Sequence, residues 1–158
     1  MAGYPNAEII MGTGSALIRE ARPEDAPALS RLLDDFGFPA SAESIVDRLG
    51  VLAQANESVL VAQEGNEVIG FATVHVMPVL HRPTPVGRIS AIMVAEDRRG
   101  RGVGCALMAA AERVASSRGC ALMEVTSNRA LTAAHAFYEH LGYEISSFRF
   151  RKVIEDYR

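Results

Sequence analysis

The chain has 158 residues, 49% of them hydrophobic, which is the length and composition of one globular domain with a sizeable core. A net charge of −3 argues against a general nucleic-acid-binding protein, which needs a basic surface. No apolar run reaches the roughly 18 residues of a membrane helix, and two cysteines cannot form a disulfide framework, so we expect a cytoplasmic protein with reduced thiols and no membrane partner.

The first residues have the composition of a flexible N-terminal tail. Residues 1–14 are rich in Gly, Pro and Asn and lack the basic start and long apolar stretch of a signal peptide. We therefore place one domain over residues 15–158, beginning with a short strand at 15–21.

Two helices are expected after this strand. The stretch RPEDAPALSRLLDDFG predicts the first, because Pro23 suits an initial helical position. Its apolar residues recur at helical spacing: Leu29, Leu32, Leu33 and Phe36. Ser41 is placed to cap the second helix. The buried face of that helix is expected to contain Ile45, Leu49 and Leu52.

The rest of the chain predicts further strands and helices. Two β-rich runs on either side of Gly65-Asn66 predict a hairpin within 58–78, and three prolines mark a loop at 77–85. The later elements are a strand at 87–94, a helix at 102–118, a strand at 120–128, a helix at 130–142 and a closing strand at 143–153. We expect an α/β fold with a mixed, mostly antiparallel sheet, two early helices, one helix after the fourth strand, and a C-terminal helix and strand.

Residues 96–107, EDRRGRGVGCAL, place alternate glycines and several charges at the start of a helix. Glycine lets the backbone approach a ligand closely, and the free N–H groups of a helix start favour an anion, above all a pyrophosphate. A P-loop and a dinucleotide-binding turn both fail at Cys105, where the first needs a lysine and the second a small residue. A solvated arginine-rich helix start and a short Arg-Gly patch for nucleic acid stay open as alternatives.

The stretch VAEDRRGRGVGCAL resembles motif A of the GCN5-related N-acetyltransferase (GNAT) family. The resemblance implies that this turn binds the pyrophosphate of the cosubstrate acetyl-CoA. The residues expected to do so are Arg99, Gly100, Arg101, Gly102, Val103 and Gly104. It also implies that the preceding strand binds the pantetheine arm through backbone groups of Ile92, Met93 and Val94.

The stretch SNRALTAAHAFYEHLGY is similar to motif B of the same family. This implies that the Tyr138 hydroxyl lies near the CoA sulfur, where a phenol can protonate the departing thiolate. Asn128 is expected to contact the pantetheine, with a purely structural role as helix N-cap as the alternative. His135 lies one helical turn before Tyr138 and is expected to contact CoA or to orient that tyrosine, unless it is an ordinary surface residue.

The strand at 87–94 has no carboxylate, although many relatives have a glutamate there, and Ser90 stands near that position. An alkyl amine must nevertheless lose a proton before it attacks a thioester. Glu124, His75 and His135 are the candidate bases, directly or through water, and each also has an ordinary structural interpretation. We expect that no single side chain is the essential base and that water carries the proton away with help from Glu124. The candidate catalytic residues are therefore Tyr138 and Glu124.

The resemblance implies acetyl transfer by direct attack of a primary amine on the thioester, and the acceptor is expected to be a small molecule. Acceptor contacts are expected from residues 34–44, with Phe36, Phe38 and several acids, and from the loop at 77–85, with His81 and Arg82. The alternatives are a protein or peptide N-acetyltransferase and a CoA-binding sensor or interaction domain with weak or no catalysis. We expect no metal and no nucleic-acid partner, and a homodimer by analogy with relatives.

Overall fold

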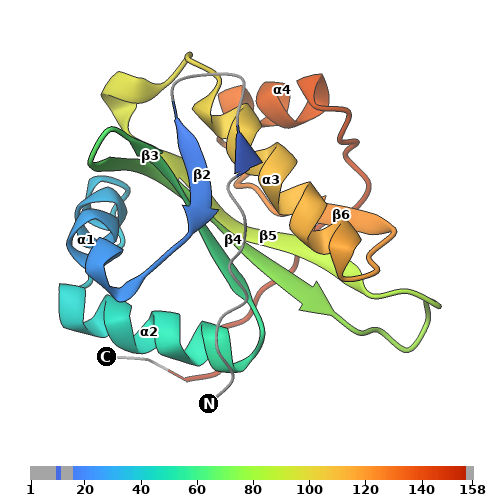
Figure 1. Ribbon diagram of the computed structural model, residues 1–158. Coiled ribbons are helices and arrows are strands. Elements are labelled where there is room, and N and C mark those ends of the chain that lie inside the picture. Colours follow the sequence, from blue (N-terminus) through green and yellow to red (C-terminus); the bar gives the residue numbers. More distant parts are fainter. Residues whose placement is uncertain (1–9, 12–15, 156–158) are drawn as a thin grey trace. The chain divides into compact units, whose positions relative to one another are not determined.

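The computed structural model describes residues 10–11 and 16–155. Its contacts divide the chain into two compact units, with the boundary between Val125 and Thr126. The first unit contains a mixed sheet and three α-helices, and the second contains one helix and the C-terminal segment (Figure 1). None of the helices in the described residues combines the length and apolar character needed to cross a bilayer.

The sheet of the first unit has six strands in the order of the sequence. They are β1 (Ile10–Met11), β2 (Leu17–Glu20), β3 (Ser58–Glu64), β4 (Glu67–Met77), β5 (Val86–Val94) and β6 (Leu122–Val125). All neighbours are antiparallel except β5 and β6, which are parallel. A parallel pair needs a long crossover, and the helix between these strands provides it. The expected mixed, mostly antiparallel sheet is confirmed, and β1 adds a short strand within the stretch that the sequence placed in the tail.

Helices cover both faces of this sheet (Figure 1). Helices α1 (Ala26–Asp35) and α2 (Ala42–Gln54) pack on one face, where Leu29, Leu32 and Ile45 form one buried cluster with Val59, Val61 and Phe71 of the strands. Helix α3 (Val103–Ser117) packs on the opposite face through residues that include Leu107, Met108 and Ala111. The core therefore has two layers, one on each side of β3 and β4.

Polar contacts fix the starts of the first two helices. The Asp25 carboxylate accepts two hydrogen bonds of 2.8 Å from the Arg19 guanidinium and one of 2.7 Å from the Arg22 N–H. Burial alone would raise the pKa of Asp25, but these hydrogen bonds outweigh it and lower the pKa. The contact therefore stabilises the fold fully above a pH of about 4 and loses this contribution as the pH falls further. At the second helix the Ser41 hydroxyl accepts the Ser44 N–H at 3.2 Å, which confirms the expected cap.

The hairpin around Gly65 is confirmed, and its end is tied to the segment before α3. Glu64 and Glu67 are directly opposite each other in β3 and β4, an arrangement that is unfavourable for two like charges. Arg98 lies in the short 3-10 helix Glu96–Arg98 and binds both carboxylates, at 2.6 and 3.0 Å. This bridge connects the hairpin to the chain segment that leads into the glycine turn.

A β-bulge interrupts the pairing of β4 with β5. Thr73 pairs with Ala91 and Val74 pairs with Ile89, so Ser90 has no partner residue in β4. An extra residue of this kind bends the strand and turns its side chain to a new direction. Ser90 and Ala91 are therefore consecutive residues on the face that α1 and α2 cover.

The second unit differs from the sequence expectation at its C-terminal end. Helix α4 (Thr132–His140) is present, but residues 143–154 form no strand in the described structure. The alternation of Phe148 and Phe150 with arginines suits a strand, yet a strand also needs a hydrogen-bonding neighbour, and this unit contains no other strand among its described residues. The side chains of Phe148 and Phe150 are 84% and 92% exposed.

Gly70 is essential for the close packing of β4, β5 and α3. A Cβ at this position would lie 2.8 Å from the Met93 carbonyl oxygen and 3.4 Å from Leu107 Cδ1. We predict that Gly70→Ala lowers the free energy of unfolding by about 1–3 kcal/mol, because the backbone must move to make room. Urea denaturation of the purified variant measures this change.

The same substitution at Gly50 is the control. Gly50 lies inside α2 with no atom within 4 Å of an added Cβ. Gly50→Ala should raise the stability by about 1 kcal/mol, since alanine favours a helix more than glycine does. Equal effects at both positions would contradict the packing described for Gly70.

Candidate functional site

The glycine turn between β5 and α3 leaves the start of α3 without a side-chain cap. Gly100 and Gly102 have φ angles of +73° and +82°, which glycine adopts without strain. Gly102 is the N-cap residue of α3, it can offer no side chain, and the first helical turn contains no acid. The first N–H groups of a helix have no partner within the helix, and together with the helix dipole they form an anion site. The predicted cofactor residues Gly102, Val103 and Gly104 occupy this first turn.

The three arginines near this turn have different roles. Arg98 forms ion pairs with the carboxylates of Glu64 and Glu67 in the hairpin and of its neighbour Asp97, so its charge is already paired within the protein. Arg99 lies with its guanidinium carbon 5.1 Å from the centre of the Phe36 ring, and its Nε donates to the Val94 carbonyl oxygen at 3.1 Å. These contacts place one cation beside the last residue of β5. Arg101 is exposed next to Gly102.

Strand β5 has an open edge next to the glycine turn. β6 pairs with β5 only from Val86 to Ile89, and the described structure contains no further pairs between these strands. Beyond this point alternate residues of 90–94 direct backbone groups away from β4. The predicted residues Ile92, Met93 and Val94 lie on this edge, so an extended ligand can add to β5 there as a strand would.

Five polar residues form a stripe, four of them on β4, β5 and β6 and one in the segment before β3. We call Glu57, His75, Ser90, Arg88 and Glu124 the polar stripe. His75 is paired with Arg88, and Arg88 with Glu124, so their side chains share one face of the sheet. His75 Nε2 lies 2.7 Å from the Ser90 hydroxyl, and Nδ1 lies 3.5 Å from Glu57 Oε2.

The candidate base Glu124 forms an ion pair with Arg88. Its Oε1 accepts hydrogen bonds from both Nε and Nη2 of the guanidinium, and both side chains are about two-fifths exposed, at 39% and 43%. These charge-assisted hydrogen bonds are both accepted by Oε1, and a neighbouring guanidinium favours the ionised form of a carboxylate.

The second unit contains the other predicted residues, and two of them are joined by hydrogen bonds. Asn128 does not cap α4, whose N-cap residue is Leu131; instead its side-chain oxygen accepts the Ala130 N–H at 3.0 Å. His135 Nε2 donates to the Asn128 carbonyl oxygen at 2.9 Å. Both residues therefore order the turn that precedes α4.

Tyr138 belongs to an aromatic cluster in this unit. Its ring meets Phe137 edge-on at 5.3 Å and Tyr143 at 6.2 Å between ring centres. Burial raises the pKa of the Tyr138 hydroxyl above its ordinary value, because a phenolate is poorly solvated there. The hydroxyl is therefore protonated at neutral pH and able to donate a proton.

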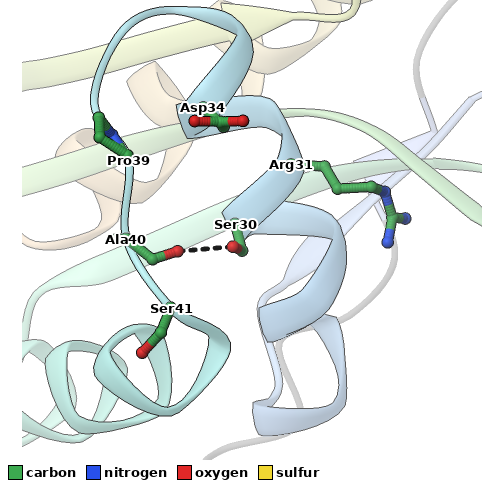
Figure 2. Close-up of a pocket in the computed structure, with 6 residues that line it drawn as sticks. All are labelled: Ser30, Arg31, Asp34, Pro39, Ala40 and Ser41. Carbon is green, nitrogen blue, oxygen red and sulfur yellow. Dashed lines mark hydrogen bonds between the residues drawn. The ribbon is translucent and has the colours of Figure 1, made fainter.

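An open depression of about 440 Å³ lies beside α1 (Figure 2). It is lined by Ser30, Arg31, Asp34, Pro39, Ala40 and Ser41. The Ser30 hydroxyl donates to the Ala40 carbonyl at 2.6 Å and holds the connection to α2 against α1. Of the two phenylalanines expected to form a pocket floor, Phe36 supports Arg99 and Phe38 is 63% exposed.

Comparison with known proteins gives the family. The sequence profile of the Acetyltransferase (GNAT) family matches residues 19–143, which run through the glycine turn, the open edge of β5 and α4. The chain belongs to this family. It is accordingly an N-acetyltransferase, and the resemblance seen in the two motifs is confirmed.

Individual relatives agree with this assignment. An aminoalkylphosphonate N-acetyltransferase of Salmonella typhimurium is 34% identical over 142 residues, which cover 87% of this acetyltransferase and 90% of the relative. A Trypanosoma brucei acetyltransferase has the same fold, with a TM-score of 0.76, 23% identity and coverage of 87% and 98% of the two chains. An aminoglycoside N-acetyltransferase in complex with CoA also has it, with a TM-score of 0.74, 22% identity and coverage of 85% and 93%.

One polar residue of the acetyltransferase was missed in the sequence. Glu57 belongs to no motif, and it precedes a strand that reads as ordinary buried sheet. Its contact with His75 depends on the register of β3 and β4, because its Oε2 also accepts the Val76 N–H at 2.9 Å. Spacing in the sequence contains no signal for such a contact.

Proposed function

We propose that this acetyltransferase moves the acetyl group of acetyl-CoA to a primary amine of a small molecule by direct attack on the thioester. The observation that carries the proposal is the uncapped, glycine-rich start of α3 beside the open edge of β5. The first feature suits a pyrophosphate and the second suits an extended amide-containing arm. Arg99 lies between the two, since it contacts Val94 at the end of β5.

The chain's own residues would perform the reaction as follows. Bound acetyl-CoA supplies an electrophilic thioester carbon. A backbone N–H on the open edge of β5, at residues 92–94, stabilises the negative charge that develops on the carbonyl oxygen. Tyr138 donates its proton to the departing sulfur. Glu124 has a supporting part only, because its carboxylate is paired with Arg88.

The acceptor amine is proposed to carry an anionic group. The Salmonella relative is named for aminoalkylphosphonates, which combine an amine with a phosphonate. In this chain His81 and Arg82 are exposed in the loop between β4 and β5 and are available to an anion. The loop follows the end of β4 directly, and β4 contains His75 of the polar stripe.

A screen of primary amines tests this function. Thiol release from acetyl-CoA and the mass of the product should show acetylation of small amines. An aminoalkylphosphonate should react at least about tenfold faster, as kcat/KM, than the matched alkylamine without phosphonate, because charge-assisted hydrogen bonds are worth about 1.5–3 kcal/mol. Turnover of peptides alone would show a protein acetyltransferase, and CoA binding without thiol release would show a sensor domain.

A second prediction concerns the pyrophosphate site. Gly102→Asp places a negative charge where the diphosphate is proposed to bind, and calorimetry should show CoA affinity lowered by about tenfold or more through repulsion between like charges. Gly102→Asn is the matched control, because asparagine has the same shape, has no charge and tolerates a positive φ. Equal CoA affinities of the two variants would contradict the site.

A third prediction concerns Tyr138. Tyr138→Phe should lower kcat by about 10²–10⁴ and leave the acetyl-CoA KM nearly constant, because it removes a proton donor and no binding contact. Since burial raises the pKa of Tyr138, the wild-type rate should show no loss from its ionisation below a pH of about 10. Steady-state kinetics across pH measure both effects.

Tyr143→Phe is the control for this experiment. This substitution also removes a phenolic hydroxyl, but from the neighbouring ring of the aromatic cluster. Its kcat should stay within about threefold of wild type, since this ring has no proposed part in proton transfer. A Tyr138→Phe variant as active as Tyr143→Phe would show that Tyr138 is a structural residue.

A further inference from the structure

We propose that Glu57, His75 and Ser90 form a proton relay that removes a proton from the acceptor amine. Ser90 contacts the amine, His75 accepts the proton through the Ser90 hydroxyl, and Glu57 is a positioning residue for the imidazole. The proposal rests on the proposed function. It replaces the expectation from the sequence that water and no single side chain takes the proton.

The contacts have the order that a relay needs. The Ser90 hydroxyl lies 2.7 Å from His75 Nε2, which is a hydrogen-bond distance. The opposite ring nitrogen, Nδ1, lies 3.5 Å from Glu57 Oε2. Glu57 is itself held by the Val76 N–H at 2.9 Å. A carboxylate beside Nδ1 favours a proton on that nitrogen and leaves Nε2 free to accept one.

The exposures of the three side chains decrease along the relay. Ser90 is exposed, whereas the side chains of His75 and Glu57 are 25% and 15% exposed. A substrate therefore reaches the serine first. The bulge between β4 and β5 explains the exposed position, because Ser90 is the extra residue of β5.

The position of Ser90 on β5 suits the reacting end of acetyl-CoA. Val94 is the end of the open edge that leads into the glycine turn, and Arg99 contacts its carbonyl oxygen, so a pyrophosphate bound at this turn would lie at the Val94 end. Four residues back along β5 is Ser90, at about 13 Å for a strand rise of about 3.3 Å per residue. An arm bound along this edge from the glycine turn runs toward Ser90, so its thioester end lies on that side.

The charges around His75 suit a transient imidazolium. Arg88 is its partner on β5, and Glu124 on β6 pairs with that arginine. Glu57 faces the ring from the segment before β3, while Arg118 at the end of α3 binds Asn56 and Ser58 on either side of Glu57. The two carboxylates of the polar stripe, Glu57 and Glu124, therefore lie on either side of the pair formed by His75 and Arg88.

The other candidate bases are less suited to this task. Glu124 is paired through Oε1 with Arg88, and a guanidinium beside a carboxylate favours its ionised form over the protonated one. His135 uses Nε2 to donate to the Asn128 carbonyl and so has no free acceptor at that nitrogen. Only His75 among these three has a hydroxyl of the same unit at hydrogen-bond distance in the described structure.

The proton balance is complete. An ammonium acceptor gives one proton to Ser90 Oγ as the serine proton moves to His75 Nε2, which leaves a neutral amine and an imidazolium. The amine nitrogen forms a bond to the carbonyl carbon and the bond from that carbon to sulfur breaks. The second amine proton replaces the one that Tyr138 gives to sulfur, and His75 releases its proton to water.

Kinetics with the best amine of the screen test the relay. His75→Gln should lower kcat/KM at neutral pH by about 10², the usual size of general-base catalysis, and should move the acidic limb of the pH profile toward the ionisation of the acceptor amine itself. Ser90→Ala should lower kcat/KM by at least about tenfold. Ser90→Thr should have a kcat/KM close to that of the wild type, because threonine keeps the hydroxyl. His140→Gln is the control, since this histidine is exposed at the end of α4 and should leave the profile unchanged.

Measurements without turnover separate a loss of proton transfer from a loss of cosubstrate binding. Nitrogen NMR of the protein without acetyl-CoA should show the His75 ring protonated at Nδ1, and Glu57→Gln should weaken this preference. CoA affinity should be equal in wild type and His75→Gln, so that loss of activity reports the reaction and not the cosubstrate site. A wild type that acetylates no amine overturns the proposed function as well as the relay.

Three results would overturn the relay alone. The first is an active His75→Gln variant with an unchanged acidic limb. The second is a His75 ring protonated at Nε2 in the free protein. The third is an acetylated Ser90, found by mass spectrometry after incubation with acetyl-CoA and no amine, because it would make the serine a nucleophile and not a proton carrier.

Discussion

Strand β5 is paired from end to end on one side, apart from the bulge at Ser90, and along only its first four residues on the other. This asymmetry creates the free backbone groups on which the proposed cosubstrate site depends. It arises because β6 ends at Val125, where the first unit of the chain also ends. A sheet edge inside a domain normally needs a partner, and in this family member the proposed partner is a ligand.

The environment of α3 complements this open edge. Arg98 joins the hairpin of β3 and β4, and its charge is used to hold the turn in place. Arg99, one residue later, is held by Phe36 and the Val94 carbonyl and keeps an exposed cation near the helix start. Two adjacent arginines of the same motif therefore have separate tasks, one in packing and one in the proposed binding of an anion.

In this acetyltransferase, whose strand β5 has no carboxylate, the polar stripe is the proposed route for the proton of the acceptor amine. Ser90 is the extra residue of the bulge, and its hydroxyl lies 2.7 Å from His75 Nε2 on the adjacent strand β4. A hydroxyl cannot hold an extra proton at neutral pH, so the proposal gives that task to the imidazole, which has the Glu57 carboxylate beside its Nδ1. The base of this site is thus proposed to be distributed over three chain segments that no local motif connects.

The sequence by itself determined the family and most of the elements, and it pointed to the start of α3 as the candidate anion site. Those features depend on local chemistry: apolar residues at helical spacing, a capping serine at Ser41, a turn at Gly65 and glycines where φ is positive. The prediction of a closing strand at 143–153 was wrong, because a strand requires a hydrogen-bonding neighbour and an alternating sequence pattern does not show whether one exists. The tertiary structure alone decided that Arg98 is paired, that Glu124 is held by Arg88 and that Glu57, His75 and Ser90 meet. Each of these contacts joins residues far apart in the chain. The contacts depend on the register of the strands and on a one-residue bulge, and both of these follow from the packing of the whole sheet.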